Sequence, residues 1–290
     1  MTDKNTVFAE KTTLNLRGKL LDLSTPLVMG ILNLTPDSFY QPEGRDGQPA
    51  LNQVLKEAEQ MLQDGASILD LGAYSSRPNA EHISAAEELQ RLLPVLQALV
   101  KTFPEAVFSV DTFRAEVAEK AIEAGAHIIN DISAGELDEN MFETVARLKV
   151  PYILMHMQGT PQTMQNNPSY EHVIPELTDY FVKKIQKLHD LGAYDLLIDP
   201  GFGFGKTLEH NYEILGKLET FKMLQVPLLA GVSRKSMIYK VLGGTAADAL
   251  NGTTVANTIA LLKGAKILRV HDVKPAVEAV KIFNTMNSRI

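Results

Sequence analysis

Short apolar runs rich in β-branched residues recur along the whole chain and restrict its fold more than any other feature. Segments with helical periodicity separate them, for example residues 51–65, 84–102, 115–126 and 176–193. Several of these segments close with a glycine, which favours a helix C-terminus. Strands that are apolar on both faces are typical of buried parallel sheets. The runs begin at Pro26, Ile68, Val107, His127, Tyr152, Leu196, Pro227 and Ile267.

Eight strand–helix units in 290 residues predict an α/β fold, a closed (β/α)₈ TIM barrel. An open Rossmann-like sheet is the alternative. Residues 8–24 include "TTLNLRGKLLDLS", which predicts an N-terminal β-hairpin that turns at Arg17 and Gly18 and covers the bottom of the barrel. We find no linker, so we expect one domain over residues 1–290.

Composition excludes several classes of chemistry. The chain contains no cysteine, which excludes disulfides and thiolate nucleophiles and suits a reducing cytoplasm. No apolar run approaches the roughly 20 residues of a membrane span, so we expect a soluble, cytoplasmic protein. A net charge of −7 argues against nucleic-acid binding. Any anionic ligand must therefore be bound by a local group of cations.

Polar residues follow every predicted strand, and in (β/α)₈ barrels the active site lies at these strand ends. One aspartate there is usually a helix N-cap, which is how we interpret Asp131. A whole ring of polar groups instead predicts an active site. Its members are Asn33, Gly72 with residues 75–77, Asp111, Asn130, His156, Asp199, residues 233–235, Arg269 and His271.

The stretch "DPGFGFGKT" at residues 199–207 has neither Walker A nor dinucleotide-fingerprint spacing. Its glycines would let a flat ligand approach the backbone closely, with Phe202 or Phe204 as a wall. We expect one of these two phenylalanines to be buried in the core.

The local cations that an anionic ligand would need occur in "GVSRKS" and "RVHDV". These segments place Lys235, Arg269 and His271 after the last two strands, the usual anion site of such barrels. Arg234 can instead be solvated surface, because neighbouring side chains cannot all face inward. The absence of cysteine and of a close histidine pair argues against zinc. Asn33 offers a hard oxygen that suits one Mg²⁺ ion, although a structural asparagine is the alternative.

Seven motifs, in order, resemble the dihydropteroate synthase family over nearly the whole chain: "MGILNLTPDSF", "SVDT", "NDIS", "MHMQGTP", "DPGFGFGK", "GVSRKS" and "RVHDV". The resemblance implies a (β/α)₈ barrel that condenses 6-hydroxymethyl-7,8-dihydropterin pyrophosphate with p-aminobenzoate. The implied products are 7,8-dihydropteroate and pyrophosphate, formed in folate biosynthesis with Mg²⁺ present. It further implies a homodimer and a sulfonamide target.

The resemblance also assigns site residues, and Asp111, Lys235, Arg269 and His271 would be the catalytic ones. It places the pterin between Asp111, Asn130, Asp199 and Lys235, with Met155, Phe204 and Arg269 as walls. Pyrophosphate would lie at Asn33, Arg77, Arg269 and His271, with the metal on Asn33. p-Aminobenzoate would contact Phe39, Ser76, Pro78, Lys235 and Ser236.

Two loops depart from the family pattern. Tyr74 replaces an acid, and Gln41 occupies the position of a loop aspartate, for which Glu43 is a possible substitute. The implied mechanism is dissociative: pyrophosphate leaves, and the arylamine adds to the resulting pterin cation. Two rival functions are a methyltetrahydrofolate-dependent methyltransferase, which would not need these cations, and a pterin-binding homologue without activity.

Overall fold

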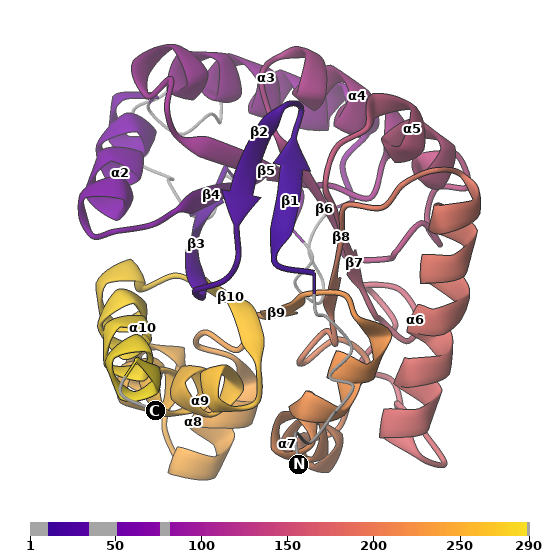
Figure 1. The fold of residues 1–290 in the computed structure, drawn as a ribbon, viewed down its shortest axis with the longest axis vertical. Helices are drawn as coiled ribbons and strands as arrows, with labels where there is room; N and C mark the ends of the chain where they lie inside the picture. Colours follow the sequence, from indigo (N-terminus) through magenta and orange to yellow (C-terminus); the bar gives the residue numbers. More distant parts are fainter. Residues whose placement is uncertain (1–10, 35–50, 76–81, 289–290) are drawn as a thin grey trace, which may run out of the picture.

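A computed structural model describes residues 11–34, 51–75 and 82–288, and its centre is a closed barrel of parallel strands (Figure 1). The order around the barrel is β10-β3-β4-β5-β6-β7-β8-β9. The barrel prediction is confirmed, and the open-sheet alternative is wrong. That residues 1–290 form one domain stays a prediction. The strands are β3 (Leu27–Asn33), β4 (Ile68–Gly72), β5 (Val107–Asp111), β6 (Ile128–Asp131), β7 (Tyr152–Met155), β8 (Leu196–Asp199), β9 (Leu228–Ala230) and β10 (Ala265–Val270).

Helices surround the barrel. The four predicted helical segments form α2 (Leu51–Gln63), α3 (Ala85–Thr102), α4 (Ala115–Glu123) and α6 (Val173–Asp190). Gly65, Gly125 and Gly192 follow three of them at φ of 101°, 108° and 84°, values that glycine adopts at little steric cost. The others are α5 (Met141–Leu148), α7 (Leu208–Gly216), α8 (Ser236–Leu242), α9 (Leu250–Leu262), α10 (Val273–Asn287) and the 3₁₀ helices η1 (Leu218–Leu224) and η2 (Ala246–Ala249).

These helices outnumber the eight predicted segments. Within the described residues, the excess comes from the 3₁₀ helices and from α8 and α9, which together follow β9. No described helix is both long and apolar enough to cross a membrane.

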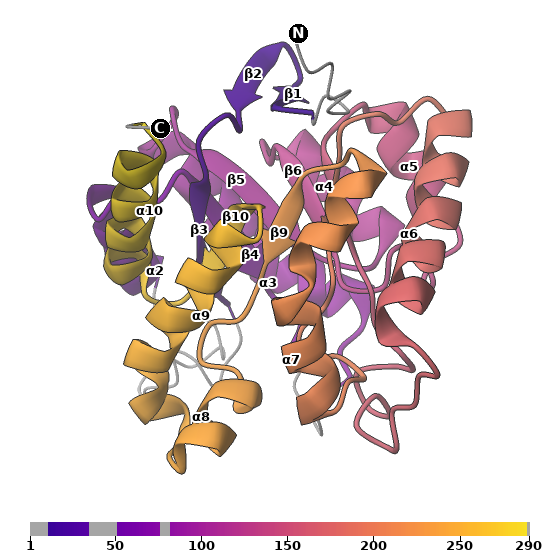
Figure 2. The same ribbon diagram turned by 60° about the horizontal axis from the view of Figure 1, so that its bottom comes forward.

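The predicted hairpin closes one end of the barrel. Strands β1 (Thr13–Leu16) and β2 (Lys19–Asp22) pair antiparallel. Arg17 and Gly18 between them have φ of 55° and 105°, the positive values of a type I′ turn. Figure 2 shows the hairpin at the end of the barrel opposite α8. Three of its leucines pack against the lower barrel layer: Leu14, Leu16 and Leu23 contact a cluster containing Met29, Ile68, Val107, Ile128, Ile153, Leu197, Leu229 and Ile267.

The period of two along each strand connects this apolar layer to the opposite rim. Residues i and i+2 face the same side of a strand. Ile68, Asp70 and Gly72 of β4 therefore face the barrel interior in succession. The same alternation of side chains places polar residues directly above the apolar layer in several strands.

Candidate active site

The polar ring forms at the carboxyl ends of the strands because their registers coincide. Asn33 pairs with Gly72, Gly72 with Asp111, and Asp111 with Asn130. On the far side of the ring Met155 pairs with Asp199. Four neighbouring strands thus end at one level, which places Asn33, Gly72, Asp111 and Asn130 on one rim.

Arg269 of β10 links the two acids on β4 and β5. Its Nε donates to Asp70 at 2.6 Å and its Nη2 to Asp111 at 2.7 Å. Asn130 Nδ2 also donates to Asp70, at 3.0 Å. Arg269 therefore lies over the interior, with its guanidinium oriented by two carboxylates.

Asp70 is the main residue that the sequence analysis missed. Its side chain is fully buried, two residues before Gly72 and on the same face. A carboxylate inside an otherwise apolar strand was the available signal, because such a charge needs a cation nearby. The strand-end rule covers only the last residues of each strand, and Asp70 lies two residues before the end of β4.

Burial opposes charge throughout this cluster. Burial raises the pKa of Asp111 to about 7, although Arg269 acts in the opposite direction. Burial likewise lowers the pKa of Lys235 to about 8, with Asp199 opposing. For Arg269 burial favours the neutral form, but Asp70 and Asp111 outweigh it and hold the pKa above its usual value. Arg269 therefore keeps its charge, whereas burial favours the neutral form of Asp111.

Asp199 and Lys235 form the opposite side of the ring. Asp199 Oδ1 accepts the backbone N–H of Gly201 at 2.7 Å, and burial raises the pKa of this acid, with Lys235 opposing. The Lys235 ammonium donates to the carbonyl of Phe202 and lies 4.7 Å from the ring centroid of Phe204. Both charged groups point at the glycine-rich turn that follows β8.

The two phenylalanines of that turn have different roles. Phe202 is fully buried in the main core, as expected for one of the pair. Phe204 is only partly buried and packs against an apolar cluster that includes Met155. An apolar wall thus stands beside the polar ring. The buried members of the cluster are Phe113, Ile132, Met155, Met157 and Met164, and Tyr74 also packs against it.

His156 does not contribute to the rim as the sequence suggested. Its Nδ1 lies 3.0 Å from Lys206 Nζ, and that ammonium also donates to the carbonyls of His156 and Phe204. Burial lowers the pKa of His156 to about 2, so the ring is neutral and accepts from the lysine. This buried pair ties the end of β7 to the turn that holds Phe204.

Asp131 also has a different role from the predicted helix N-cap. It accepts from the backbone N–H groups of Ser133 and Gly135 at 2.7 and 2.8 Å and from the Tyr152 hydroxyl at 2.6 Å. The N-cap of α5 is Asn140. The helix N-cap prediction is wrong because the chain makes a turn after β6, and Asp131 stabilises that turn instead.

The anion side lies where the loops after β9 and β10 meet. His271 is exposed, and its Nδ1 lies 3.1 Å from Ser233 Oγ. Arg234 turns away and forms two hydrogen bonds with Asp272, at 2.8 and 2.9 Å. Arg234 is therefore a paired structural residue rather than solvated surface. Ser236 begins α8 directly after Lys235.

Several predicted site residues lie outside the described residues. These are Phe39, Ser76, Arg77 and Pro78, together with Gln41 and Glu43. Tyr74, the substitution in the second loop, is described. Its hydroxyl lies 3.2 Å from His82 Nδ1 and accepts from Gln162 Nε2 at 3.2 Å. The family's acid is thus replaced here by a hydrogen-bonded aromatic residue.

The donor set fits a magnesium ion bound by one protein oxygen. Among the described residues no group of three or more His, Cys, Asp or Glu side chains could hold a metal. Asn33 offers an amide oxygen at the rim, in register with Gly72. Mg²⁺ commonly takes one or two protein ligands and completes its shell with water and substrate phosphates.

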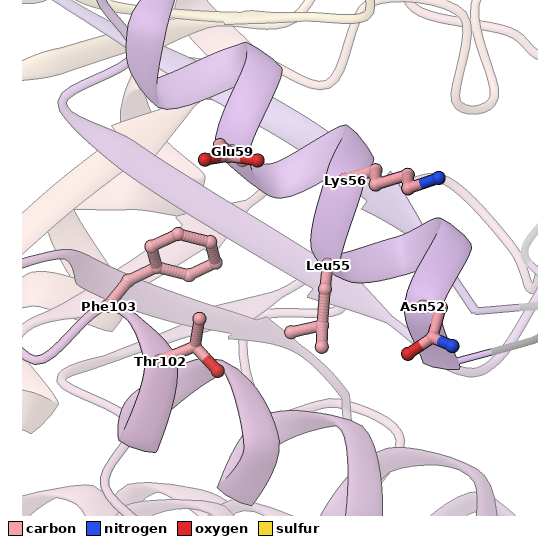
Figure 3. Close-up of a pocket in the computed structure, with 6 residues that line it drawn as sticks. All are labelled: Asn52, Leu55, Lys56, Glu59, Thr102 and Phe103. Atoms are coloured by element: carbon pink, nitrogen blue, oxygen red, sulfur yellow. The ribbon is translucent and has the colours of Figure 1, made fainter.

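Two surface cavities lie among the helices. One of about 310 Å³ lies between α2 and the end of α3 and contains no strand-end residue (Figure 3). Its lining residues are Asn52, Leu55, Lys56, Glu59, Thr102 and Phe103. The second, of about 300 Å³, lies between α2 and the start of α10 and includes His271. Only the second adjoins the candidate site.

Comparison with known proteins agrees with this geometry. The family model described as "Pterin binding enzyme" matches residues 29–271. Dihydropteroate synthase of Escherichia coli K12 is 45% identical over 268 residues, covering 92% of this chain and 93% of that protein. A crystal structure of Yersinia pestis dihydropteroate synthase with a sulfonamide drug complex has a TM-score of 0.88 and 42% identity, covering 95% of this chain and 99% of that one. A structure from Xanthomonas albilineans, in complex with 7,8-dihydropteroate, has a TM-score of 0.84 and 35% identity, with 95% and 99% coverage.

The fold and the site thus define a pterin-binding barrel, and the chain belongs to the pterin binding enzyme family. Within that family it is a dihydropteroate synthase of folate synthesis. The resemblance inferred from the motifs is confirmed, and the methyltransferase alternative is set aside.

Proposed function

We propose that the polar ring condenses 6-hydroxymethyl-7,8-dihydropterin pyrophosphate with p-aminobenzoate by a dissociative substitution. The observation that carries this proposal is Arg269, held by Asp70 and Asp111 over the interior and followed two residues later by His271. The end of β10 and the residue after Val270 thereby connect the buried acids to a cationic group that can bind an anion. A substrate with a neutral ring system and an anionic leaving group matches that polarity.

The pterin would lie between Asp111, Asn130 and Asp199, whose oxygens accept from its amine and ring N–H groups. Lys235 would donate to the ring carbonyl, and Met155 and Phe204 would pack against the ring faces. Arg269 completes the pocket as a wall. A molecule without these donors and acceptors would leave buried polar atoms unpaired, which is how such a site selects its substrate.

Pyrophosphate would lie at Asn33, Arg269 and His271, with Arg77 from the second loop. When bound at Asn33, Mg²⁺ supplies positive charge that neutralises the leaving group. As the bond from the exocyclic methylene carbon to the pyrophosphate oxygen breaks, Arg269 and His271 stabilise the departing charge. Asp111 faces the positive charge that develops on the pterin. In this scheme the carboxylates and cations act electrostatically, and no side chain forms a bond to substrate.

p-Aminobenzoate would approach along the loop after β9. Lys235 and Ser236 lie there, and Phe39, Ser76 and Pro78 are proposed to complete its subsite. Its amine then forms the new carbon–nitrogen bond and loses a proton, which gives 7,8-dihydropteroate.

The test is pyrophosphate release with and without p-aminobenzoate. We expect release that depends on the arylamine and on Mg²⁺, and His271→Ala should weaken pyrophosphate binding far more than binding of a pterin without phosphate. Equal losses for both ligands would show that His271 is structural. Pterin binding without turnover would support the inactive-homologue alternative.

We also propose that the chain is a cytoplasmic homodimer. Val255, Ile259 and Leu262 are 54%, 36% and 55% exposed, and they are spaced along one face of α9. Ile282 of α10 is 71% exposed. A second copy could bury these apolar side chains. Val255→Glu should shift the mass measured by light scattering toward the monomer, whereas an unchanged mass would place the contact elsewhere.

The lack of cysteine supports the cytoplasmic location.

A further inference from the structure

Two consecutive residues of the loop after β9 bind two consecutive residues of the loop after β10. Ser233 contacts His271, and Arg234 pairs with Asp272. We call these contacts the first and second rung. The first rung has two parts: the backbone N–H of His271 donates to Ser233 Oγ at 3.1 Å, and Oγ lies 3.1 Å from the ring Nδ1.

The first rung determines where the histidine ring carries its proton. A backbone N–H can only donate, so Ser233 Oγ must be its acceptor. The hydroxyl then has one proton of its own to donate. Ser233 is 4% exposed, and within residues 11–34, 51–75 and 82–288 Nδ1 is the acceptor that this proton reaches. In a neutral ring Nδ1 therefore accepts, and the proton is on Nε2.

The tautomer matters for an anion site. With the proton on Nε2, the neutral ring can donate at Nε2 to a phosphate oxygen. With the proton on Nδ1, the ring would turn a lone pair toward that oxygen, and two acceptors would face each other. A doubly protonated ring donates from either nitrogen, so this choice is important only for the neutral form.

We propose that Ser233 is a positioning residue that holds neutral His271 as the Nε2–H tautomer and so keeps its donor directed at pyrophosphate. This inference rests on the proposed function in one respect, namely that His271 faces pyrophosphate. The tautomer is inferred from the two contacts of Ser233 in the first rung. Both parts can therefore be tested separately.

The second rung joins the same two loops beside the first rung. Arg234 has φ of 53°, a value uncommon for a residue with a side chain. Its guanidinium bonds Asp272 and the carbonyls of Ala246 and Ala247, and its backbone N–H donates to Thr253 at 3.0 Å. These contacts fix the loop without touching the His271 ring. Asp272→Asn is therefore a matched control, because it weakens the second rung and leaves the Ser233 hydroxyl in place.

Charged groups also lie around His271. The adjoining cavity is lined by Glu57 of α2, by Asp64 just after that helix, and by Asp272 and Lys274 beside the start of α10, and Arg234 pairs with Asp272. All of them are retained in a Ser233 variant. A comparison of wild type and variant at one pH therefore isolates the hydroxyl.

The experiment is ¹⁵N NMR of the histidine side chains in the full chain, recorded about two pH units above the ordinary histidine pKa of about 6.5. The His271→Ala spectrum identifies the His271 signals. We expect a protonated Nε2 and an unprotonated Nδ1 in wild type and in Asp272→Asn, a mixed signature in Ser233→Ala, and recovery in Ser233→Thr. A protonated Nδ1 in wild type, or an unchanged signature in Ser233→Ala, would overturn the inference.

Calorimetry with pyrophosphate and Mg²⁺ tests the functional half. We expect Ser233→Ala to bind pyrophosphate roughly fivefold to tenfold more weakly at that pH, about what one ordinary hydrogen bond contributes. The loss should shrink to about twofold at a lower pH at which the same NMR spectra show both ring nitrogens of His271 protonated. If His271→Ala leaves pyrophosphate affinity unchanged, the proposed function of His271 fails, whatever the tautomer. If only Ser233→Ala leaves it unchanged, the positioning role fails.

Discussion

The two ends of the barrel are built from the same eight strands but by opposite physical means. At the bottom, Met29, Ile68 and their neighbours form an apolar layer closed by the hairpin leucines. At the rim, two to four residues further along the strands, Arg269 forms ion pairs with the fully buried Asp70 and the partly buried Asp111. The bottom gains free energy from apolar burial. At the rim, each buried charge needs a partner whose attraction offsets the cost of desolvation.

This difference separates stability from function. An apolar layer tolerates conservative change, because its interactions are non-directional. The rim has no such tolerance, since removing one charge leaves another unpaired. We therefore expect rim substitutions to affect stability and binding together, and bottom substitutions to affect stability alone.

The largest effect is expected at Asp70. Asp70→Ala removes one of the two carboxylates that hold Arg269, together with the acceptor of Asn130. Breaking a buried ion pair costs about 3–5 kcal/mol, which urea unfolding can measure. Ser109→Ala is the matched control, because Ser109 pairs with Asp70 in register and its hydroxyl has no hydrogen-bond partner among the described residues. A loss at Asp70 no larger than that at Ser109 would contradict a structural ion pair.

Asp199→Asn should be next, and its effect should appear in binding. The change turns one acceptor oxygen into a donor that faces the donors of the pterin. We expect a loss on the order of 2–5 kcal/mol in pterin binding, as for a broken buried charged pair. Calorimetry with the pterin substrate measures it, with the unfolding midpoint as a check on the fold. Unchanged affinity would rule out this pocket assignment.

Leu16→Ala tests the opposite half of the comparison. Leu16 is 4% exposed in the hairpin plug, and we expect a loss of about 2 kcal/mol, the low end for a buried leucine, because the plug lies at the end of the barrel. Pterin affinity should stay within about twofold. Leu20→Ala on the same hairpin is the control, since Leu20 is 67% exposed; its effect should stay within about 0.5 kcal/mol. A large loss of pterin affinity in Leu16→Ala would show that the two ends are coupled.

The smallest effect concerns pH and Asp111. Burial raises its pKa to about 7, so the folded protein binds this proton more tightly than the unfolded chain does. The resulting stability is complete below the unfolded value near 3.8 and is lost as the pH rises toward 7. Pterin binding needs the carboxylate and should instead weaken as the pH falls below 7, by up to about tenfold, or 1.4 kcal/mol, per pH unit.

Opposite pH slopes for stability and pterin affinity are thus the signature of Asp111. Asp111→Asn should flatten both contributions, which urea unfolding and calorimetry at several pH values can show. Retention of the wild-type slope for pterin binding in this variant would assign the titration to another acid, such as Asp199.

Local sequence patterns were enough to predict the barrel, the hairpin and the strand-end positions of Asn33, Asp111 and Asn130. Strand positions followed from apolar runs, the hairpin from Arg17 and Gly18, and the rim residues from the rule that catalytic groups follow parallel strands. These signals are local: each depends on the period of two or on a few adjacent residues. The motif order then indicated the family, which the comparisons confirmed.

Tertiary structure alone decided the partners. Arg269 binds Asp70, 199 residues earlier in the chain, because barrel closure pairs β10 with β3 and brings β4 within reach. Ser233 and His271 are 38 residues apart, and Lys206 and His156 are 50 apart. In each case a residue type suggests a charge or a donor but not its partner. The partner depends on register and barrel closure, which are properties of the packed strands rather than of any one segment.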